Sequence, residues 1–488
     1  MRSALPSPTT RRRLPRALAP IAAAALAVPL LAATPTAPTY AATAGVSTGV
    51  STGVTTGTTT GTSTAARRDP NPVTPGDFTG YGFDQCLTPT QDKMDAWLRS
   101  SPYLAVGIYI SGDSRACRNQ PNLTPEWVST QLARGWKLLP ITLGPQASCQ
   151  PRFPRYDDDF TISPKPGSSG TYYQARKMGQ NSAVETVEDA QRLGLTKGST
   201  LWYDLEGFDL GNNRCRESAL WFLHAWVSKV EQLGYASGVY SSAGSGIRAL
   251  DDARVNRPGT FRLPQHIWIA RWDGQANTST SYIRADGWLP GGRMKQYRGG
   301  HDERWGGVTI NIDSNYLDLG RGSVAPAERH CGGVRISFND YVPLFRPVDG
   351  KRASKRHVKA LQCYLTERKL YDGPINGMYH QGMLPVVQAW RKSRGISTTS
   401  STWYRRDWMT ITAYGAKPLL KVGHASKHVR RVQRTLNAAH LGSTLSVTGT
   451  FDNRTTSLVR TYQGKVGLPQ TGIVDRKTWN KLMRGRRG

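Results

Sequence analysis

Two acidic side chains, Asp204 and Glu206, stand two residues apart at the end of a short apolar run, 200–207. Residues two apart on a β-strand share one face, with their Cα atoms roughly 6.5–7 Å apart. This spacing suits two-carboxylate chemistry, in which one group protonates a leaving oxygen and the other attacks or stabilises the cation that develops at a sugar. An Asp-x-Glu pair is also a common loop cap or salt-bridge partner, so the pair alone leaves both interpretations open.

The elements that must position this pair form an alternating series of short apolar runs and helical segments. We predict strands at 81–84, 103–111, 137–143, 201–205, 235–240, 266–272, 294–297 and 308–312. Two of the intervening helices begin at a capping residue followed by proline, and three end at glycine. The alternation predicts an α/β fold, a parallel (β/α)8 TIM-like barrel over residues 76–322. The helical pattern between residues 272 and 294 is weak, so an incomplete barrel is the alternative.

A closed barrel would bring four acids to one mouth, because the C-terminal strand ends of this fold meet at one face. Asp84 would end the first strand, Asp204 and Glu206 the fourth, and Asp313 the eighth. We therefore predict that these four residues form a catalytic site. For each acid taken singly, a structural capping role is the alternative.

Five aromatic residues fall at or near strand ends and would add a substrate-binding surface. They are Tyr109, Tyr203, Tyr240, Trp272 and Tyr297. Sugar rings present apolar C–H faces that stack on aromatic planes. An aromatic residue in a barrel can equally belong to the core, and we expect Tyr240 and Trp272 to be the best candidates for binding.

The N-terminus is typical of an exported protein. Four arginines within residues 11–16 precede an apolar run over 18–33 and then small residues, which predicts a cleaved signal peptide at 1–44. The run 10–14 resembles the twin-arginine export motif, and an ordinary secretory signal is the alternative. Residues 45–75, rich in glycine, threonine and serine, predict a disordered tether. No other run reaches about 18 apolar residues, so we predict a secreted protein without a transmembrane span.

Six cysteines in an exported chain predict disulfides, because the compartment is oxidising. They are Cys86, Cys117, Cys149, Cys215, Cys331 and Cys363. The sequence permits fifteen pairings. In the predicted barrel, pairs 86–117 and 149–215 would pin loops at the mouth, and 331–363 would tie the next module to the last strand. The spacing of cysteines and histidines matches no metal site, so we predict neither metal nor cofactor.

The C-terminal third contains an internal repeat. Residues 358–365 align with 429–436, 376–379 with 448–451 and 386–390 with 458–462, and Trp408 aligns with Trp479, at an offset of 71 or 72 residues. Apolar residues at intervals of three and four predict small three-helix modules. We place them at 340–415 and 417–486.

Positive charge is concentrated in the same region. The chain has a net charge of +30, and the segment from residue 341 onward holds 28 Lys and Arg against 6 Asp and Glu. A segment this basic is expected to meet an anionic partner. Nucleic acid would fit the charge, but an exported chain seldom meets it. We therefore predict peptidoglycan and anionic wall polymers as partners, and no nucleic acid.

Four runs carry a family resemblance: Gly80–Cys86, Gly107–Ile110, Trp202–Glu206 and Ser237–Ser242. On these residues the barrel resembles the glycoside-hydrolase-like family of exported actinobacterial wall proteins and, more distantly, the Chalaropsis-type lysozymes. The resemblance implies that Glu206 is the general acid and that Asp204 orients the substrate's acetamido group or stabilises an oxazolinium-like cation. It also implies that Asp84 and Asp313 act in support from across the mouth.

The second repeat resembles the three-helix peptidoglycan-binding module, through the runs 449–452, 467–469 and 472–474 and the pair 478–479. The first repeat is degenerate, because it lacks the glycine turn after the second helix. Together the two resemblances imply a cell-wall-associated hydrolase that cleaves peptidoglycan glycan strands as a muramidase does. A non-catalytic glycan-binding wall protein is the alternative.

Overall fold

The computed structural model describes residues 70–155 and 158–487. The predicted signal peptide and most of the predicted tether lie outside these residues. The last residues of that tether belong to the barrel instead, because Thr74 is buried and its hydroxyl bonds to both the main-chain N and the carbonyl O of Leu138. Among the described residues, no helix is both long and apolar enough to cross a membrane.

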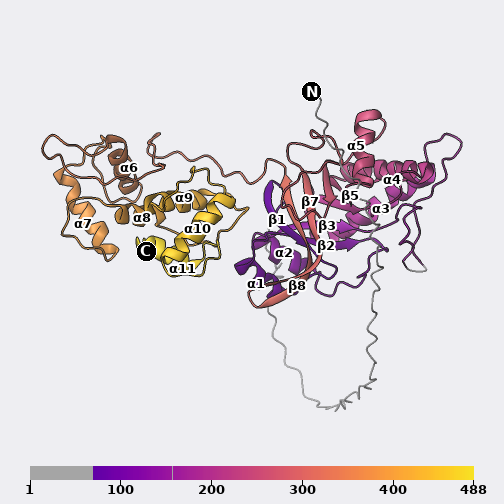
Figure 1. Ribbon diagram of the computed structural model, residues 1–488, viewed down its shortest axis with the longest axis horizontal. Helices are drawn as coiled ribbons and strands as arrows, with labels where there is room; N and C mark the ends of the chain where they lie inside the picture. Colours follow the sequence, from indigo (N-terminus) through magenta and orange to yellow (C-terminus); the bar gives the residue numbers. More distant parts are fainter. Residues whose placement is uncertain (1–69, 156–157, 488) are drawn as a thin grey trace, which may run out of the picture. The chain divides into compact units, whose positions relative to one another are not determined.

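Eight strands close into one barrel, which confirms the predicted fold class (Figure 1). The strands are β1 (Phe78–Asp84), β2 (Ala105–Ser111), β3 (Lys137–Thr142), β4 (Thr200–Asp204), β5 (Ala236–Ser242), β6 (His266–Ala270), β7 (Gly292–Trp305) and β8 (Val308–Leu319). Strands β1 to β7 pair in sequence order and in parallel. The barrel closes where β8 pairs with both β7 and β1.

The last strand corrects the prediction of an all-parallel barrel, because β8 runs antiparallel to both of its neighbours. Only the two residues Gly306 and Gly307, both with positive φ, separate β7 from β8. A turn this short makes a hairpin, whereas a parallel pair needs a crossover of about a dozen residues. The register of the hairpin sets Asp313 directly opposite Asp84. Asp313 therefore reaches the predicted mouth although its strand runs in the opposite direction.

Five helices pack on the outside of the barrel. They are α1 (Gln91–Ser100), α2 (Pro125–Ala133), α3 (Tyr173–Arg192), α4 (Asn213–Gln232) and α5 (Gly246–Asn256). The side chain of Thr124 caps α2 by accepting from the main-chain N of Trp127, and Asn212 caps α4 in the same way. Residues 271–291, between β6 and β7, form no helix. Buried Lys295 holds that loop, donating to Asp273 at 3.0 Å.

Alternation along the strands divides the apolar residues into two layers. Side chains that point inward, among them Trp202, Trp268 and Met294, form a cluster inside the barrel. Those that point outward, among them Phe83 and Tyr203, join a larger cluster under the helices. Successive strand residues face opposite sides, so the inner cluster forms a floor below the inward-facing ends of the strands.

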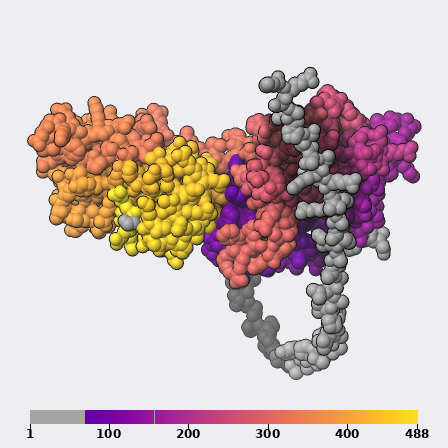
Figure 2. Space-filling view, viewed as in Figure 1, coloured from indigo at the N-terminus to yellow at the C-terminus, as the bar shows by residue number. Residues whose placement is uncertain are grey.

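The C-terminal region consists of two similar groups of helices. The first contains α6 (Lys355–Thr366), the 3-10 helix η1 (Gln381–Met383), α7 (Leu384–Ser393) and α8 (Arg405–Ala413); the second contains α9 (Lys427–Ala439), α10 (Asn453–Lys465) and α11 (Arg476–Met483). One apolar cluster runs through both groups, and Figure 2 shows them as a continuous body, coloured orange to yellow. The two repeats therefore share a core.

A buried glutamine shows that the two copies are built alike. Gln362 accepts a hydrogen bond from the main-chain N of Gly377 at 2.8 Å, and Gln433 accepts one from Gly449 at 2.9 Å. Both glycines have positive φ, a conformation that side chains with a Cβ rarely adopt. The same turn thus follows the first helix of each copy.

The copies differ after the second helix, as their sequences predict. In the second copy Gln463 accepts a hydrogen bond from Gly472. The first copy has Arg391 at the equivalent position, and this side chain forms a buried ion pair with Asp407 at 2.6 Å. The arginine replaces the glycine turn as the structural support of that corner.

Three disulfides link the cysteines as Cys86–Cys117, Cys149–Cys215 and Cys331–Cys363. The first ties the loop after β1 to the loop after β2, and the second ties the loop after β3 to the start of α4. The third joins the segment after β8 to α6. These are the pairings that the barrel arrangement favoured among the fifteen that were possible.

Candidate active site

The mouth of the barrel carries all four acids that were predicted from the sequence. Asp84 ends β1, Asp204 ends β4, Glu206 lies two residues beyond β4, and Asp313 lies within β8. Asp84, Glu206 and Asp313 line one hollow of about 290 Å³. Asp204 lies just below it, 2% exposed. The acids therefore gather from three strands into one site.

Asp84 and Asp313 form the first carboxylate pair. Asn315 donates a hydrogen bond to Asp84 at 2.6 Å, and Gln296 approaches both of its oxygens at 3.3 Å. Burial raises the pKa of Asp84 well above its usual value, and the neighbouring carboxylate of Asp313 raises it further. Burial also raises the pKa of Asp313. A hydrogen bond from the main-chain N of Gly300 opposes this rise, but its effect is smaller. The pair therefore keeps a proton to a higher pH than two separate aspartates would.

Asp204 and Glu206 form the second pair. Tyr109 donates to Oδ2 of Asp204 at 3.3 Å, while Oδ1 is buried and has no hydrogen-bond partner among the described residues. Burial raises the pKa of Asp204 well above its usual value, and the carboxylate of Glu206 adds to the rise. An acceptor that is buried without a partner is costly unless a ligand supplies one.

Glu206 is the member of this pair that reaches the rim. Its main-chain N donates to the side chain of Gln146 at 2.8 Å, and Gln146 donates in turn to the carbonyl O of Asp204 at 2.8 Å. Gln146 thus fixes the backbone that carries both acids. Burial raises the pKa of Glu206, although Arg152 and Arg155 act against the rise. Within the pair, the repulsion between the two carboxylates raises the pKa of Asp204.

Three of the five predicted aromatic residues lie at this mouth. Tyr109 contacts Asp204, and Tyr240 and Trp272 both donate to the side chain of Gln296, at 3.1 and 2.9 Å. Trp272 is 68% exposed and lines a second hollow of about 360 Å³, which also includes Glu206 and Tyr240. Glu206 therefore stands where two hollows meet.

The other two aromatic residues do not lie where a substrate would bind. Tyr203 is 0% exposed and packs against Phe222 and Trp226 of α4, so its ring offers no face to a sugar. Tyr297 is partly buried near Tyr103, away from the residues that line either hollow. Each follows or precedes an inward-facing residue in its strand and therefore points outward.

Sequence reasoning missed the polar residues that hold the acids in place. Gln296 connects Asp84, Tyr240 and Trp272, and Asn315 connects Asp84 with the indole N of Trp268. The alternation of strand residues could have found Asn315, because it lies two residues after Asp313 on the same strand. Gln146 lies in a loop and gave no such signal.

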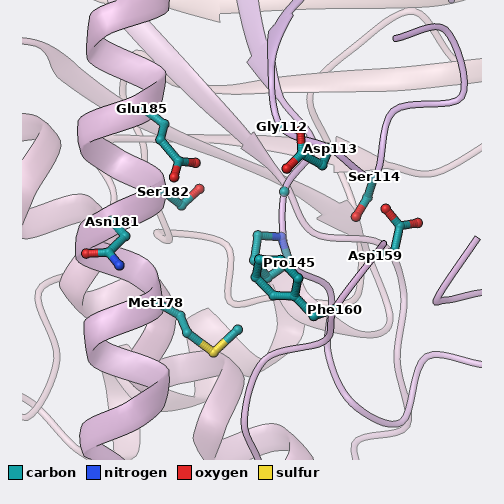
Figure 3. Close-up of a pocket in the computed structure, with 11 residues that line it drawn as sticks. Gly112, Asp113, Ser114, Pro145, Asp159, Phe160, Met178, Asn181, Ser182 and Glu185 are labelled. Carbon is teal, nitrogen blue, oxygen red and sulfur yellow. The ribbon is translucent and has the colours of Figure 1, made fainter. Parts of the chain in front are cut away.

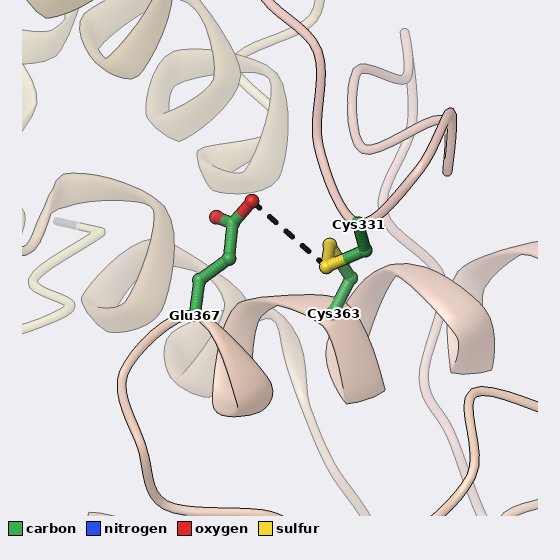
Figure 4. A group of neighbouring side chains, drawn as sticks. All are labelled: Cys331, Cys363 and Glu367. Atoms are coloured by element: carbon green, nitrogen blue, oxygen red, sulfur yellow. Dashed lines mark hydrogen bonds between the residues drawn. A yellow bond between two sulfur atoms is a disulfide. The ribbon is translucent and has the colours of Figure 1, made fainter.

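One group of three metal-binding side chains occurs in the described residues, and it is not a metal site. Cys331, Cys363 and Glu367 bring their ligand atoms close together (Figure 4). Both sulfurs are already bonded to each other. Neither sulfur is therefore a free thiolate that could bind a metal. Glu367 approaches the sulfur of Cys331 to 3.9 Å, but that sulfur has no proton to donate, so this is a contact and not a hydrogen bond.

A further hollow of about 110 Å³ lies between α3 and the loops that follow β2 and β3 (Figure 3). Asp113, Asp159 and Glu185 face it, and Asp159 is paired with Arg118 at 3.0 Å. Burial raises the pKa of Glu185. None of the four mouth acids lines this hollow, so it is distinct from the candidate active site.

A barrel with paired carboxylates at its mouth, followed along the chain by helical repeats, is typical of glycoside hydrolase-like proteins with a binding module. More particularly, residues 95–317 match the family described as Rv2525c-like, glycoside hydrolase-like domain, and residues 426–482 match the putative peptidoglycan binding domain. The chain thus combines an Rv2525c-like glycoside hydrolase-like domain with a peptidoglycan-binding domain. It is a cell-wall glycan-related protein.

The solved structures that match the chain cover about half of it. An uncharacterized protein from B. stearothermophilus is 18% identical, with a TM-score of 0.30, over 49% of this chain and 95% of that one. The Tat-secreted protein Rv2525c of Mycobacterium tuberculosis, in complex with L-tartrate, is 14% identical, with a TM-score of 0.32, over 50% and 98%. A family 25 glycosyl hydrolase from Bacillus anthracis is 13% identical, with a TM-score of 0.29, over 49% and 89%. No curated protein sequence matches the chain.

Proposed function

We propose that this protein is an exported, wall-associated glycoside hydrolase that cleaves peptidoglycan glycan strands as a muramidase does, with Glu206 as general acid. The observation that carries the proposal is the position of Glu206. It stands at the junction of two hollows, and burial keeps its pKa above the usual value. A general acid needs a raised pKa and access to the bond that it protonates.

The neighbouring aspartate has the right contacts to assist. Oδ1 of Asp204 has no partner among the described residues and would accept the N–H of the substrate's acetamido group. That bond would favour the ionised form of Asp204, which leaves the proton of the pair on Glu206. Substrate binding would thereby put the pair into its reactive state.

The reaction then proceeds in two steps. Glu206 gives its proton to the glycosidic oxygen, the C1–O bond breaks, and the acetamido carbonyl oxygen closes on C1 to form an oxazolinium-like ion. Water next attacks C1, the bond from C1 to the acetamido oxygen breaks and restores the amide carbonyl, and the attacking water gives a proton to Glu206. Asp204 orients the acetamido group throughout, while Asp84 and Asp313 support the site from the opposite strands.

The helical repeats would hold the enzyme on its substrate. The second repeat matches the peptidoglycan-binding domain, and the segment from residue 341 onward carries 28 Lys and Arg against 6 Asp and Glu. Such a charge attracts the anionic polymers of a bacterial wall. A secreted location follows from this partner and agrees with the three disulfides.

The hydrolase is tested with the mature protein, the Glu206→Gln variant and purified sacculi. We expect new reducing ends with the wild type and with the control Glu188→Gln, whose side chain is exposed on α3. The Glu206→Gln variant should release only background. Equal release by wild type and Glu206→Gln would refute the hydrolase, and a non-catalytic glycan-binding protein would then be the better description if both still sediment with sacculi.

Anchoring is tested in the same sedimentation assay. A chain that ends after residue 330 keeps both apolar clusters of the barrel, loses the cluster shared by the repeats and leaves no cysteine of the third disulfide without its partner. We expect this chain to remain in the supernatant while the full-length protein sediments. Undiminished sedimentation of the shortened chain would refute the anchoring role.

A further inference from the structure

Three arginines lie together where the two helical repeats join. Arg368 follows α6 and Arg394 follows α7, both in the first repeat, while Arg431 lies on α9 in the second. Each of these side chains is half-buried. The exposed segment 414–417, which follows α8 and connects the repeats, contacts all three. We call them the junction arginines.

An exposed aromatic ring connects the two junction arginines of the first repeat. The guanidinium carbons of Arg394 and Arg368 lie 4.9 and 5.7 Å from the ring centre of Tyr414, which is exposed. Buried Trp390 packs edge-on against Tyr414 and lies 5.0 Å from the guanidinium of Arg394. Stacking on a ring fixes the plane of a guanidinium group and leaves the N–H groups at its edge able to bind a ligand.

The other contacts of Arg368 and Arg431 are with neutral acceptors at the end of α8. Arg368 donates to the carbonyl O of Ile411 at 2.8 Å, and Arg431 donates to the carbonyl O of Ala413. The carbonyl end of a helix attracts cations, so this contact explains how the two groups are held. It does not explain Arg394, whose only hydrogen bond among the described residues is from Nε to the hydroxyl of Ser393.

No carboxylate neutralises this charge within the part of the chain that the structure describes. None of the junction arginines forms an ion pair there, and Glu367, the acid that acts on Arg368, is paired with His330 at 2.8 Å. The Nε atoms of Arg368 and Arg431 are buried without a hydrogen-bond partner. Burial and the charge of Arg368 lower the pKa of Arg431 to about 10. The like charges therefore persist at neutral pH, and a bound anion would relieve their repulsion.

The hydrogen bonds already made favour phosphate over carboxylate. Both terminal nitrogens of Arg368 donate to carbonyl oxygens, and so do both terminal nitrogens of Arg431. A ligand would therefore receive single N–H groups from several directions. A tetrahedral phosphate can accept in this way, whereas a planar carboxylate matches the parallel N–H pair of one guanidinium. A polymer with regularly spaced phosphates could also contact more than one arginine at once.

We propose that the junction of the two repeats is a binding site for a phosphodiester-linked polymer of the bacterial wall, whose phosphate groups are held by the junction arginines. The match to the peptidoglycan-binding domain spans residues 426–482, so Arg368, Arg394 and Tyr414 lie outside it. The site therefore gives the first repeat a binding role of its own. This inference deepens the proposed anchoring role, on which it rests only for the wall as the source of the polymer.

Calorimetry with the full-length protein tests the ligand class. The probes are a decamer of glycerol phosphate, inorganic phosphate and a decamer of glutamate. We expect the glycerol phosphate decamer to bind at least about tenfold more tightly than either of the others, because several phosphates meet the site together. Equal affinity for the glutamate decamer would overturn the preference for phosphate. Equal affinity for inorganic phosphate would show a site for the free ion and overturn the polymer.

Variants assign the binding to residues. Arg394→Gln removes the junction arginine with the fewest structural contacts and should weaken decamer binding about fivefold, while Arg394→Lys, which keeps the charge, should stay closer to the wild type. The control Arg352→Gln removes the same charge from an exposed position of the first repeat and should change little. Thermal unfolding checks that each variant folds. Equal weakening by Arg394→Gln and Arg352→Gln would overturn the site, and so would wild-type binding that does not weaken with added salt.

Sacculi separate this site from peptidoglycan binding. Arg394→Gln should sediment less than the wild type with sacculi that carry glycerol phosphate polymers, and equally with sacculi stripped of those polymers by acid. A loss of sedimentation on both kinds of sacculi would place Arg394 in peptidoglycan binding and refute the inference.

These outcomes are independent of catalysis. Preferential binding of the glycerol phosphate decamer without release of reducing ends would sustain this inference and refute the hydrolase. Release of reducing ends without that preference would refute the inference and sustain the hydrolase.

Discussion

Replacing Asp204 by asparagine should make the protein more stable at neutral pH and leave its stability unchanged in acid. The carboxyl of Asp204 is buried, one of its oxygens has no partner among the described residues, and its pKa is raised by burial and by Glu206. Asparagine has nearly the same shape and cannot ionise. The difference between the two proteins therefore measures the charge alone.

The sign and size follow from proton linkage. Below the ordinary pKa of aspartate, both the folded and the unfolded chain hold the proton of Asp204, and the two proteins should unfold alike. As the pH rises from there through the raised folded pKa, only the unfolded chain has lost its proton, so the wild type loses stability. One group changes the free energy of unfolding by at most about 1.4 kcal/mol per pH unit, or roughly 3–6 °C in melting temperature for a domain of this size.

The assay is thermal unfolding of wild type and Asp204→Asn at pH 4, 5, 6, 7 and 8. The control is Asp209→Asn, which removes an exposed carboxylate from the same loop and keeps an oxygen to accept from Gly211. We expect the gap between wild type and Asp204→Asn to widen with pH and the control to follow the wild type. A gap that stays the same from pH 4 to pH 8 would show that the buried charge is not the cause.

Two further substitutions test the packing around the site and within the first repeat. Gly107→Ala would place a methyl group 2.5 Å from the Cβ of Asp84; overpacking of this kind costs about 1–3 kcal/mol, which urea unfolding should detect, while Gly300→Ala, with no atom within 4 Å, should change little. Arg391→Ala would leave Asp407 buried without its partner, so we expect a loss of about 3–5 kcal/mol in the urea unfolding of the helical repeats; a loss below 1 kcal/mol would contradict a buried pair.

Most of the barrel could be predicted because the first six strands are short runs of five to seven largely uncharged residues, separated by helices. The direction of β8 could not be predicted from strand counting alone. It depends on Gly306 and Gly307, which convert two apparent strands into one long hairpin. Two glycines between two strand-like runs indicate a hairpin by themselves. The prediction followed the pattern of a parallel barrel instead.

The positions of the acids could be predicted from the strand ends alone, whereas the positions of the aromatic residues could not. Strand ends meet at one face of a barrel, and this placed Asp84 and Asp204 correctly without any knowledge of side-chain direction. The aromatic residues also needed that direction. Since Asp204 faces inward, Tyr203 must face the helices, where it packs against Trp226. The alternation of side chains along β4 thus excludes Tyr203 from the binding surface, although its position near the strand end had suggested it.

The raised pKa values at the mouth follow from the packing of the floor beneath it. Gly238 of β5 leaves the space that the ring of Trp202 fills, because an added Cβ there would come within 2.3 Å of that ring. Trp202 in turn packs against Trp268, with ring centres 5.6 Å apart. These rings replace water below the inward-facing acids, and burial is the largest cause of the raised pKa of Asp84 and of Asp204. The chemistry proposed for the rim therefore depends on glycine and tryptophan residues that never touch the substrate.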